Sequence, residues 1–156
     1  MTIAGELISL IDQNTSIKVS STLEKANGKK NLVDNSPETC WTSQQGLPQF
    51  IQLGFNNLVT PRRISITFQG GFVGTRCSIS IPSIANEDGS NKKEWTVVTH
   101  IYPEDVNRKQ SFDLLETESR FPAQGVSGLR LVFEESSDFF GRITIYDLTL
   151  EGTKIE

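Results

Sequence analysis

The stretch LRLVFEESSDFFGRITIYDLTL, which spans residues 129–150, decides the fold that this sequence predicts. Apolar residues alternate with other residues from Leu129 to Phe133, and this period of two is typical of a strand with one buried face. A second β-rich run covers residues 142–150 after a short connection. Two strands joined in this way predict an antiparallel hairpin.

The second run of this hairpin changes its apolar parity. Apolar residues up to Ile145 share one parity, and those from Tyr146 onward share the other. Such a change predicts a β-bulge near Tyr146 or Asp147, or a strand that is buried on both faces.

The connection inside the hairpin has an unusual composition. It contains Asp138, Phe139, Phe140, Gly141 and Arg142, so two large aromatic residues stand where a turn normally carries small polar ones. Either the two rings fold back onto the sheet, or they line a binding surface.

Similar alternating runs recur along the rest of the chain, separated by turn residues. The predicted strands are residues 17–23, 51–55, 63–69, 77–81, 95–101, 109–114, 129–133 and 142–150. About eight short strands with few helix signals predict an all-β protein, an antiparallel β-sandwich or jelly roll.

A chain of 156 residues fits a single domain, 1–156, with its core in residues 15–151. Residues 1–14 form an N-terminal leader segment, and residues 82–93 form a polar surface insertion. Residues 24–48 form a long irregular loop, and such loops in compact domains are usually functional or folded on themselves.

The composition limits the classes of function. Hydrophobic residues make up 36% and charged residues 22%, and the formal net charge is -4, which argues against a nucleic-acid binder that depends on phosphate contacts. The N-terminus lacks the basic region of a signal peptide, and no apolar run is long enough to cross a bilayer. We therefore expect a protein that is neither secreted nor inserted in a membrane.

Catalytic and zinc-binding residues are scarce. We expect Cys40 and Cys77 to be free thiols, and with His100, the single histidine, they are too few for a structural zinc site. His100 lies in a strand-like run with no neighbouring nucleophile, so a hydrolase relay is not indicated. We predict that the protein is not an enzyme.

Strand parity predicts a cluster of loops at one end of the sandwich. If successive strands run alternately up and down, the connections after the first, third, fifth and seventh strands emerge together. They bring residues 25–41, 69–76, 102–107 and 134–141 to or near a common edge. The candidate binding residues there are Gln69, Gly70, Gly71, Phe72, Arg76, Tyr102, Glu104, Asp105, Asp138, Phe139, Phe140 and Arg142.

Aromatic rings beside a few fixed polar groups suit the binding of peptides, sugars or other small ligands. In the alternative interpretation, Phe72, Phe139 and Phe140 cap the end of the core, and Arg142 pairs internally with Asp138. Residue type slightly favours capping for each phenylalanine taken alone, whereas the set as a whole favours a site.

A second set of residues is rich in oxygen atoms. It consists of Asp34, Asn35, Ser36, Glu38 and Thr39, with Glu151 at the end of the last strand. Calcium takes six to eight oxygen ligands, so this loop is a candidate calcium site. The spacing is not that of an EF-hand, and from the residues alone a turn with Asx hydrogen bonds is the favoured interpretation.

Three segments carry a family resemblance: VSSTLEKANGKKNLVDNSPETCWTS (19–43), PQFIQLGF (48–55) and ISITFQGGF (64–72). They resemble the discoidin or factor V/VIII C-type family, whose fold is a galactose-binding-like jelly roll. The family motif is matched by Asn31, Leu32, Val33, Asp34, Thr39 and Trp41. The resemblance covers nearly the whole chain.

The resemblance implies a mainly structural calcium ion near this loop, held by Asp34, Thr39 and Glu151. Secreted members of the family are commonly closed by a disulfide between their ends. This chain has no terminal cysteines, which agrees with an intracellular member in the nucleus, the cytoplasm or both.

The combination of QGGF (69–72), YPED (102–105) and DFFGR (138–142) resembles a small intracellular branch of the family associated with a nuclear receptor. The polar insertion 82–93 departs from that branch. We predict a non-catalytic adaptor that binds a protein partner through the loops, and the resemblance implies a co-repressor of a nuclear receptor. The alternatives are a lectin-like carbohydrate-binding module and a subunit of a ciliary-transport or ubiquitin-ligase type assembly.

Overall fold

A computed structural model describes residues 6–83, 94–114 and 120–155. In these residues it contains nine strands: β1 (Ile8–Ser9), β2 (Ser16–Val19), β3 (Trp41–Thr42), β4 (Gln49–Phe68), β5 (Arg76–Pro82), β6 (Trp95–Ile101), β7 (Lys109–Asp113), β8 (Val126–Glu135) and β9 (Thr144–Lys154). Two short 3-10 helices, η1 (Lys25–Asn27) and η2 (Lys29–Leu32), lie in the long loop. All the strand pairs are antiparallel, which confirms the predicted fold class. Most of the predicted insertion, and the first residues of the predicted leader, lie outside the described residues.

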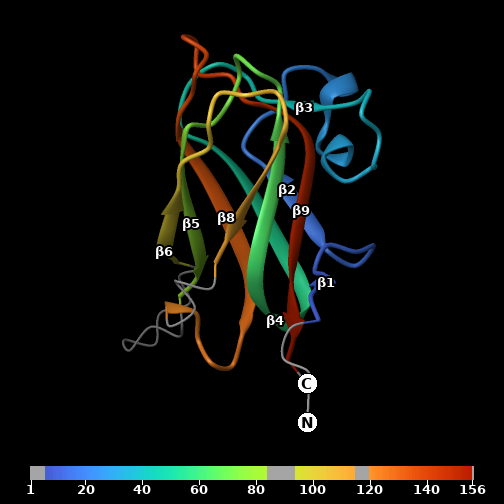
Figure 1. The fold of residues 1–156 in the computed structure, drawn as a ribbon, viewed down its shortest axis with the longest axis vertical. Helices are drawn as coiled ribbons and strands as arrows, with labels where there is room; N and C mark the ends of the chain where they lie inside the picture. Colours follow the sequence, from blue (N-terminus) through green and yellow to red (C-terminus); the bar gives the residue numbers. More distant parts are fainter. Residues whose placement is uncertain (1–5, 84–93, 115–119, 156) are drawn as a thin grey trace.

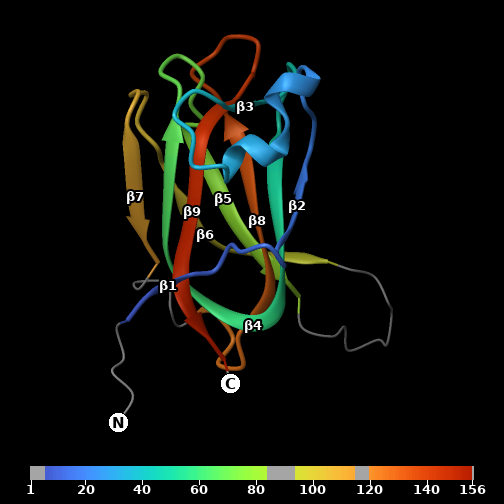
Figure 2. The ribbon, with the colours of Figure 1, turned by 90° about the vertical axis from the view of Figure 1, so that its right-hand side faces the viewer.

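The strands form two layers that share β4 (Figures 1 and 2). The first half of β4 pairs with β2 and β8, and its second half pairs with β9 and β7. The sequence predicted two separate strands here. The structure has one continuous strand that bends where its register to β8 shifts between Gly54 and Val59, and this bend contains the two turn-forming asparagines, Asn56 and Asn57.

The core lies between the layers. Leu129, Leu131 and Phe133 of β8 are fully buried, as their alternation predicted. The ring of Phe133 meets the ring of Phe68 edge to face, with 5.9 Å between their centroids. Trp41 is fully buried as well, and its indole N–H donates to the carbonyl oxygen of Ser21 at 3.0 Å. The described residues thus support one continuous core.

The predicted bulge in β9 is present. Thr67 of β4 pairs with Asp147 of β9, and its neighbour Phe68 pairs with Ile145, so Tyr146 is the extra residue. Ile145 stays buried, whereas Tyr146 and Asp147 are both half-buried. The bulge therefore places two consecutive side chains on the outside of the layer.

Both cysteines are free thiols, as predicted, and Cys77 is buried. Burial raises the pKa of the Cys77 thiol. Within the described residues no helix is long and apolar enough to span a membrane.

Close contact between β9 and β4 yields a test of the packing. A Cβ atom on Gly152 would lie against the carbonyl oxygen of Thr60, 2.8 Å from Cδ1 of Leu10 and 3.1 Å from Cα of Pro61. We expect Gly152→Ala to lower the free energy of unfolding by about 1–3 kcal/mol, measured by urea denaturation, since backbone atoms cannot move aside cheaply. Gly28→Ala is the control, because its nearest neighbour is the Lys25 carbonyl oxygen at 3.4 Å. Equal losses in both variants would contradict this packing.

Candidate binding site

Four loops meet at one end of the sandwich, and we call this end the rim: residues 43–48, 69–75, 102–108 and 136–143 (Figure 1, top). Three of these loops were predicted to meet. The fourth predicted segment, 25–41, packs through η2 against β9, β3 and β2 and lies beside the rim, where Asn35 and Ser36 line a groove together with Asn107 of loop 102–108. Loop 43–48 joins the rim as well, because the backbone N–H of Gly46 donates to the carbonyl oxygen of Phe140 at 2.8 Å.

Hydrogen bonds lock the other three loops together. One oxygen of Asp105 accepts from the Gly71 N–H at 2.8 Å and from the Ser137 hydroxyl at 3.2 Å. The side-chain oxygen of Asn107 accepts from the Gly70 N–H at 2.9 Å. The Ser137 backbone N–H donates to the Val73 carbonyl oxygen, and the Val73 N–H donates to the Ser137 hydroxyl oxygen, each at 2.9 Å. The rim is therefore ordered before any partner arrives.

The tip of the hairpin is held by a fork between Arg142 and Asp138. The guanidinium donates to the two carboxylate oxygens at 2.9 and 3.3 Å, and the Arg142 backbone N–H adds a bond at 3.0 Å. These hydrogen bonds lower the pKa of Asp138. Gly141 allows the turn because its φ is 82°, and a Cβ there would also lie 3.1 Å from Leu47.

The phenylalanines of the tip face water. Phe139 is 94% exposed and Phe140 is 53% exposed, and their rings meet edge to face at 5.3 Å. The Arg142 guanidinium lies over Phe140 and over the half-buried Phe72, at 5.8 and 5.1 Å from the ring centroids. Of the alternatives weighed from the sequence, the internal pairing of Arg142 is realised, but the Phe139 and Phe140 rings do not cap the core.

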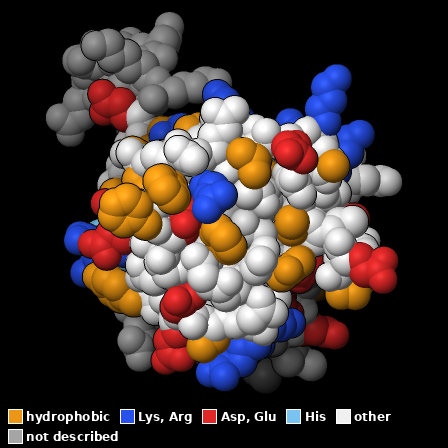
Figure 3. Space-filling view, turned by 90° about the horizontal axis from the view of Figure 1, so that it is seen from above, with side chains coloured by type: hydrophobic (Ala, Val, Ile, Leu, Met, Phe, Trp, Pro, Cys, Tyr) orange, Lys and Arg blue, Asp and Glu red, His pale blue; other side chains and the backbone are white. Residues whose placement is uncertain are grey.

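Viewed from above, this end of the molecule shows hydrophobic side chains around a basic one, among mostly uncharged atoms (Figure 3). Sequence reasoning missed one member of the rim. Leu47 is 42% exposed and lies against the hairpin tip at Gly141. A leucine between Gly46 and Pro48, in a stretch with turn composition, was the available signal.

Two of the remaining predicted rim residues, Arg76 and Tyr102, make contacts away from the tip. Arg76 lies 3.5 Å from Glu134, and Tyr102 stacks on His100, which lies 3.4 Å from the same carboxylate. Glu104 stays in loop 102–108, where its backbone bonds the side chain of Gln110. The backbone N–H of Gln69 donates to the Thr144 carbonyl oxygen at 3.0 Å, beneath the tip.

The predicted calcium ligands are not all brought together. The Asp34 carboxylate accepts from the Ser36 N–H at 3.0 Å and from the Thr39 hydroxyl at 2.6 Å, and these bonds, the Thr39 bond foremost, lower its pKa. Glu151 lies in register with Ser9 and Arg63, on the half of β9 that leads away from the rim.

The acid of β9 whose pKa responds to the charge of Asp34 is Asp147. It precedes Glu151 by about 13 Å of strand. Among the described residues no three His, Cys, Asp or Glu side chains form a metal-binding group. The Asx turn expected from the residues is present, and calcium binding stays a prediction.

Solved structures define the class of the fold. The F5/8 type C domain of a Bacteroides fragilis protein superposes with a TM-score of 0.71 at 14% identity, covering 97% of this chain and 99% of that one. The family 32 carbohydrate-binding module of Clostridium perfringens NanJ, solved with galactose, gives a TM-score of 0.68 at 15% identity, with coverage of 93% and 98%. The protein therefore has the jelly-roll fold of F5/8 type C domains and family 32 carbohydrate-binding modules.

Sequence comparison is more specific. The Nuclear receptor 2C2-associated protein of Danio rerio is 40% identical over 150 residues, covering 94% of this chain and 96% of the relative. The protein of that name from Homo sapiens is 36% identical over 150 residues, with coverage of 94% and 98%. This chain belongs to the nuclear receptor 2C2-associated protein family, which confirms the resemblance drawn from the sequence. No protein-family model matches it.

The fork at the tip predicts a dependence of stability on pH. Because the pKa of folded Asp138 lies below its ordinary value of 3.8, its charge stabilises the fold above that pH, and the stabilisation is lost as the pH falls through the folded value. We expect the difference in unfolding free energy between the wild type and Asp138→Asn to be constant near neutral pH and to shrink below pH 4. Urea titrations at several pH values measure it.

The control for this titration is Asp113→Asn. The Asp113 carboxylate is 57% exposed and lies 4.0 Å from Arg63, at the limit for an ion pair. The fork would not stabilise the rim if the difference in unfolding free energy between the wild type and Asp138→Asn persisted unchanged to pH 2.5. The same conclusion would follow if this difference were no larger than that of Asp113→Asn at neutral pH.

Proposed function

We propose that this protein is a non-catalytic adaptor that binds a protein partner through the rim, with Phe139 and Phe140 as apolar anchors. The observation that carries the proposal is the 94% exposure of Phe139 on a hairpin tip that hydrogen bonds hold in place. Water around an exposed ring is unfavourable, and complete burial of a phenylalanine contributes about 1.5–3 kcal/mol.

The rigidity of the tip supports binding to a preformed partner surface. Arg142 is held by Asp138, and the tip is tied to loop 43–48 through the Gly46 N–H. Little conformational entropy is lost when such a tip is buried, so more of the hydrophobic gain appears as affinity. Leu47 extends the apolar surface beside the tip, while Gln69 and Glu104 lie at its margin and orient the partner.

The names of the relatives support a nuclear receptor as the partner, because these proteins are named for association with nuclear receptor 2C2. In this proposal the protein acts as a co-repressor and works in the nucleus, the cytoplasm or both. The proposal assigns no catalytic role to the residues of the rim.

Carbohydrate binding is the second candidate, and the fold class is the observation that favours it. A sugar-binding ring needs polar side chains free to bond hydroxyl groups beside it. At the tip, the charged groups of Asp138 and Arg142 bond each other, which favours a protein partner over a sugar.

The decisive experiment is a binding titration with purified nuclear receptor 2C2. We expect Phe139→Ala to weaken binding by about 2 kcal/mol, close to thirtyfold, because a central aromatic anchor is lost. Thermal unfolding should be unchanged, since the ring is almost wholly exposed. The matched control is Leu58→Ala, which removes another exposed hydrophobic side chain (42% exposed) at the bend in the middle of β4, away from the rim.

A glycan array with the same variants separates the alternatives. Sugar binding lost in Phe139→Ala, with no binding to the receptor, would establish the lectin-like reading instead. Capture of a ciliary-transport or ubiquitin-ligase assembly through the same ring would keep the rim as the binding surface and replace the receptor as partner. Full receptor binding by Phe139→Ala would exclude the anchor role.

A further inference from the structure

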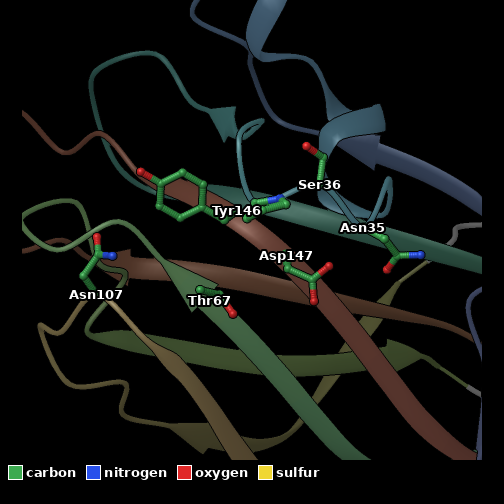
Figure 4. Close-up of a pocket in the computed structure, with 7 residues that line it drawn as sticks. Asn35, Ser36, Thr67, Asn107, Tyr146 and Asp147 are labelled. Carbon is green, nitrogen blue, oxygen red and sulfur yellow. The ribbon is translucent and has the colours of Figure 1, made fainter.

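A groove of about 500 Å³ lies on the outer face of β4 and β9, beside the rim and separate from the hairpin tip. Its floor is formed by Thr67 and Asp147, which pair across the two strands. One wall is the loop that carries Asn35 and Ser36, and the other is loop 102–108 with Asn107 (Figure 4). Pro37 and Tyr146 complete the lining.

The bulge in β9 creates this groove. In a regular strand Tyr146 and Asp147 would point to opposite faces. Because Tyr146 is the extra residue of the bulge, its ring and the Asp147 carboxylate share the outer face. Bulges commonly re-aim side chains beside functional sites.

The groove carries unused hydrogen-bonding capacity. Among the described residues, the side chains of Asp147, Thr67, Tyr146 and Asn35 have no hydrogen-bond partner. Asn107 uses its side-chain oxygen to hold Gly70, which leaves its amide N–H groups available. A half-buried carboxylate with no partner costs stability unless a ligand supplies one.

The charge of the groove selects the class of ligand. Burial raises the pKa of Asp147, and the charge of Asp34 raises it further, while Lys109 lowers it. Lys109 lies across Thr67 from Asp147 in the sheet, but no ion pair joins them in the described residues. Among the residues that line the groove, Asp147 is the one charged side chain and none is a lysine or arginine, so the charged ligand that fits the groove is a cation.

We infer that this groove binds the guanidinium group of an arginine side chain of a partner protein. A guanidinium is planar, so it can stack on the Tyr146 ring while it donates to both oxygens of Asp147. Its remaining N–H groups match the oxygen atoms of Thr67 and Asn35. A lysine ammonium has no planar face and would leave the ring unused.

The groove adjoins the rim, because Asn107 of one wall holds Gly70 of a rim loop. A partner seated on the hairpin tip can therefore place a basic segment in the groove. The inference goes beyond the rim proposal and does not need it: the groove is tested with a small probe that does not touch Phe139.

The probe is Nα-acetyl-arginine amide, titrated into the full chain and followed by ¹H–¹⁵N NMR in buffer containing EDTA. We expect saturable shifts in the backbone signals of Thr67 and Tyr146 and in the side-chain signals of Asn35 and Asn107. Nα-acetyl-citrulline amide, its uncharged analogue of the same shape, should bind about tenfold or more weakly, because it cannot form the charge-assisted bonds.

Variants assign the effect to the groove. Asp147→Asn should abolish the preference for arginine, while Glu151→Gln, farther along the same strand, should keep it. Asp147→Asn should fold with an equal or higher thermal midpoint, because a carboxyl whose pKa is raised on folding destabilises the fold at neutral pH when charged. If Asp147→Asn does not fold, Thr67→Val replaces it and should weaken arginine binding.

Three outcomes would overturn the inference: equal binding of arginine and citrulline, arginine binding that Asp147→Asn leaves intact, or shifts of the same signals by D-galactose with arginine inactive. Each is independent of the receptor titration. If Phe139→Ala binds the receptor fully while arginine still binds the wild type, the groove remains a site and the rim proposal fails. If arginine does not bind while Phe139→Ala weakens receptor binding, the rim remains the binding surface and the groove inference fails.

Discussion

The geometry of the molecule depends on β4 belonging to both layers. Its first half lies in one sheet with β2 and β8, and its second half lies in the other with β7 and β9. The bend between the halves fixes how the layers face each other and buries the alternating apolar residues of β8 between them. Because of this bend, Phe68 at the end of β4 lies at the same end of the sandwich as Gln49 at its start. The loops that follow β4, β6 and β8 therefore converge with the loop that precedes β4.

Alternation and turn composition were enough to predict the fold class, because burying one face of each strand leaves a clear period of two. The parity change at Ile145 and Tyr146 even located the bulge. The joining of 51–55 and 63–69 into one strand was not predictable, since asparagines are compatible with either a turn or a bend. Only the pairing partners on both sides decide between them.

The candidate site was predicted in part. Chain-order parity brought three rim loops together, but it could not show that loop 43–48 joins them, because that depends on a backbone bond from Gly46 to Phe140. Arg76 and Tyr102 were grouped with the tip from loop membership alone, while their contacts follow Glu134 and His100. The groove was not foreseen, since Thr67, Asn107 and Asp147 are distant in sequence and meet only through strand register.

The extra residue in β9 has a consequence for how this strand tolerates change. Removing Tyr146 would restore an even pleat in which Ile145 and Leu148 still face the interior and Asp147 still faces outward, because the pairs Phe68–Ile145 and Thr67–Asp147 flank the extra residue. The hydrophobic pattern of β9 therefore does not require the extra residue, and its loss would change the outer surface by removing the Tyr146 ring beside Asp147. A deletion farther along β9 would instead turn every later side chain to the opposite face. The strand can thus lose a residue at this one point without disturbing the interior.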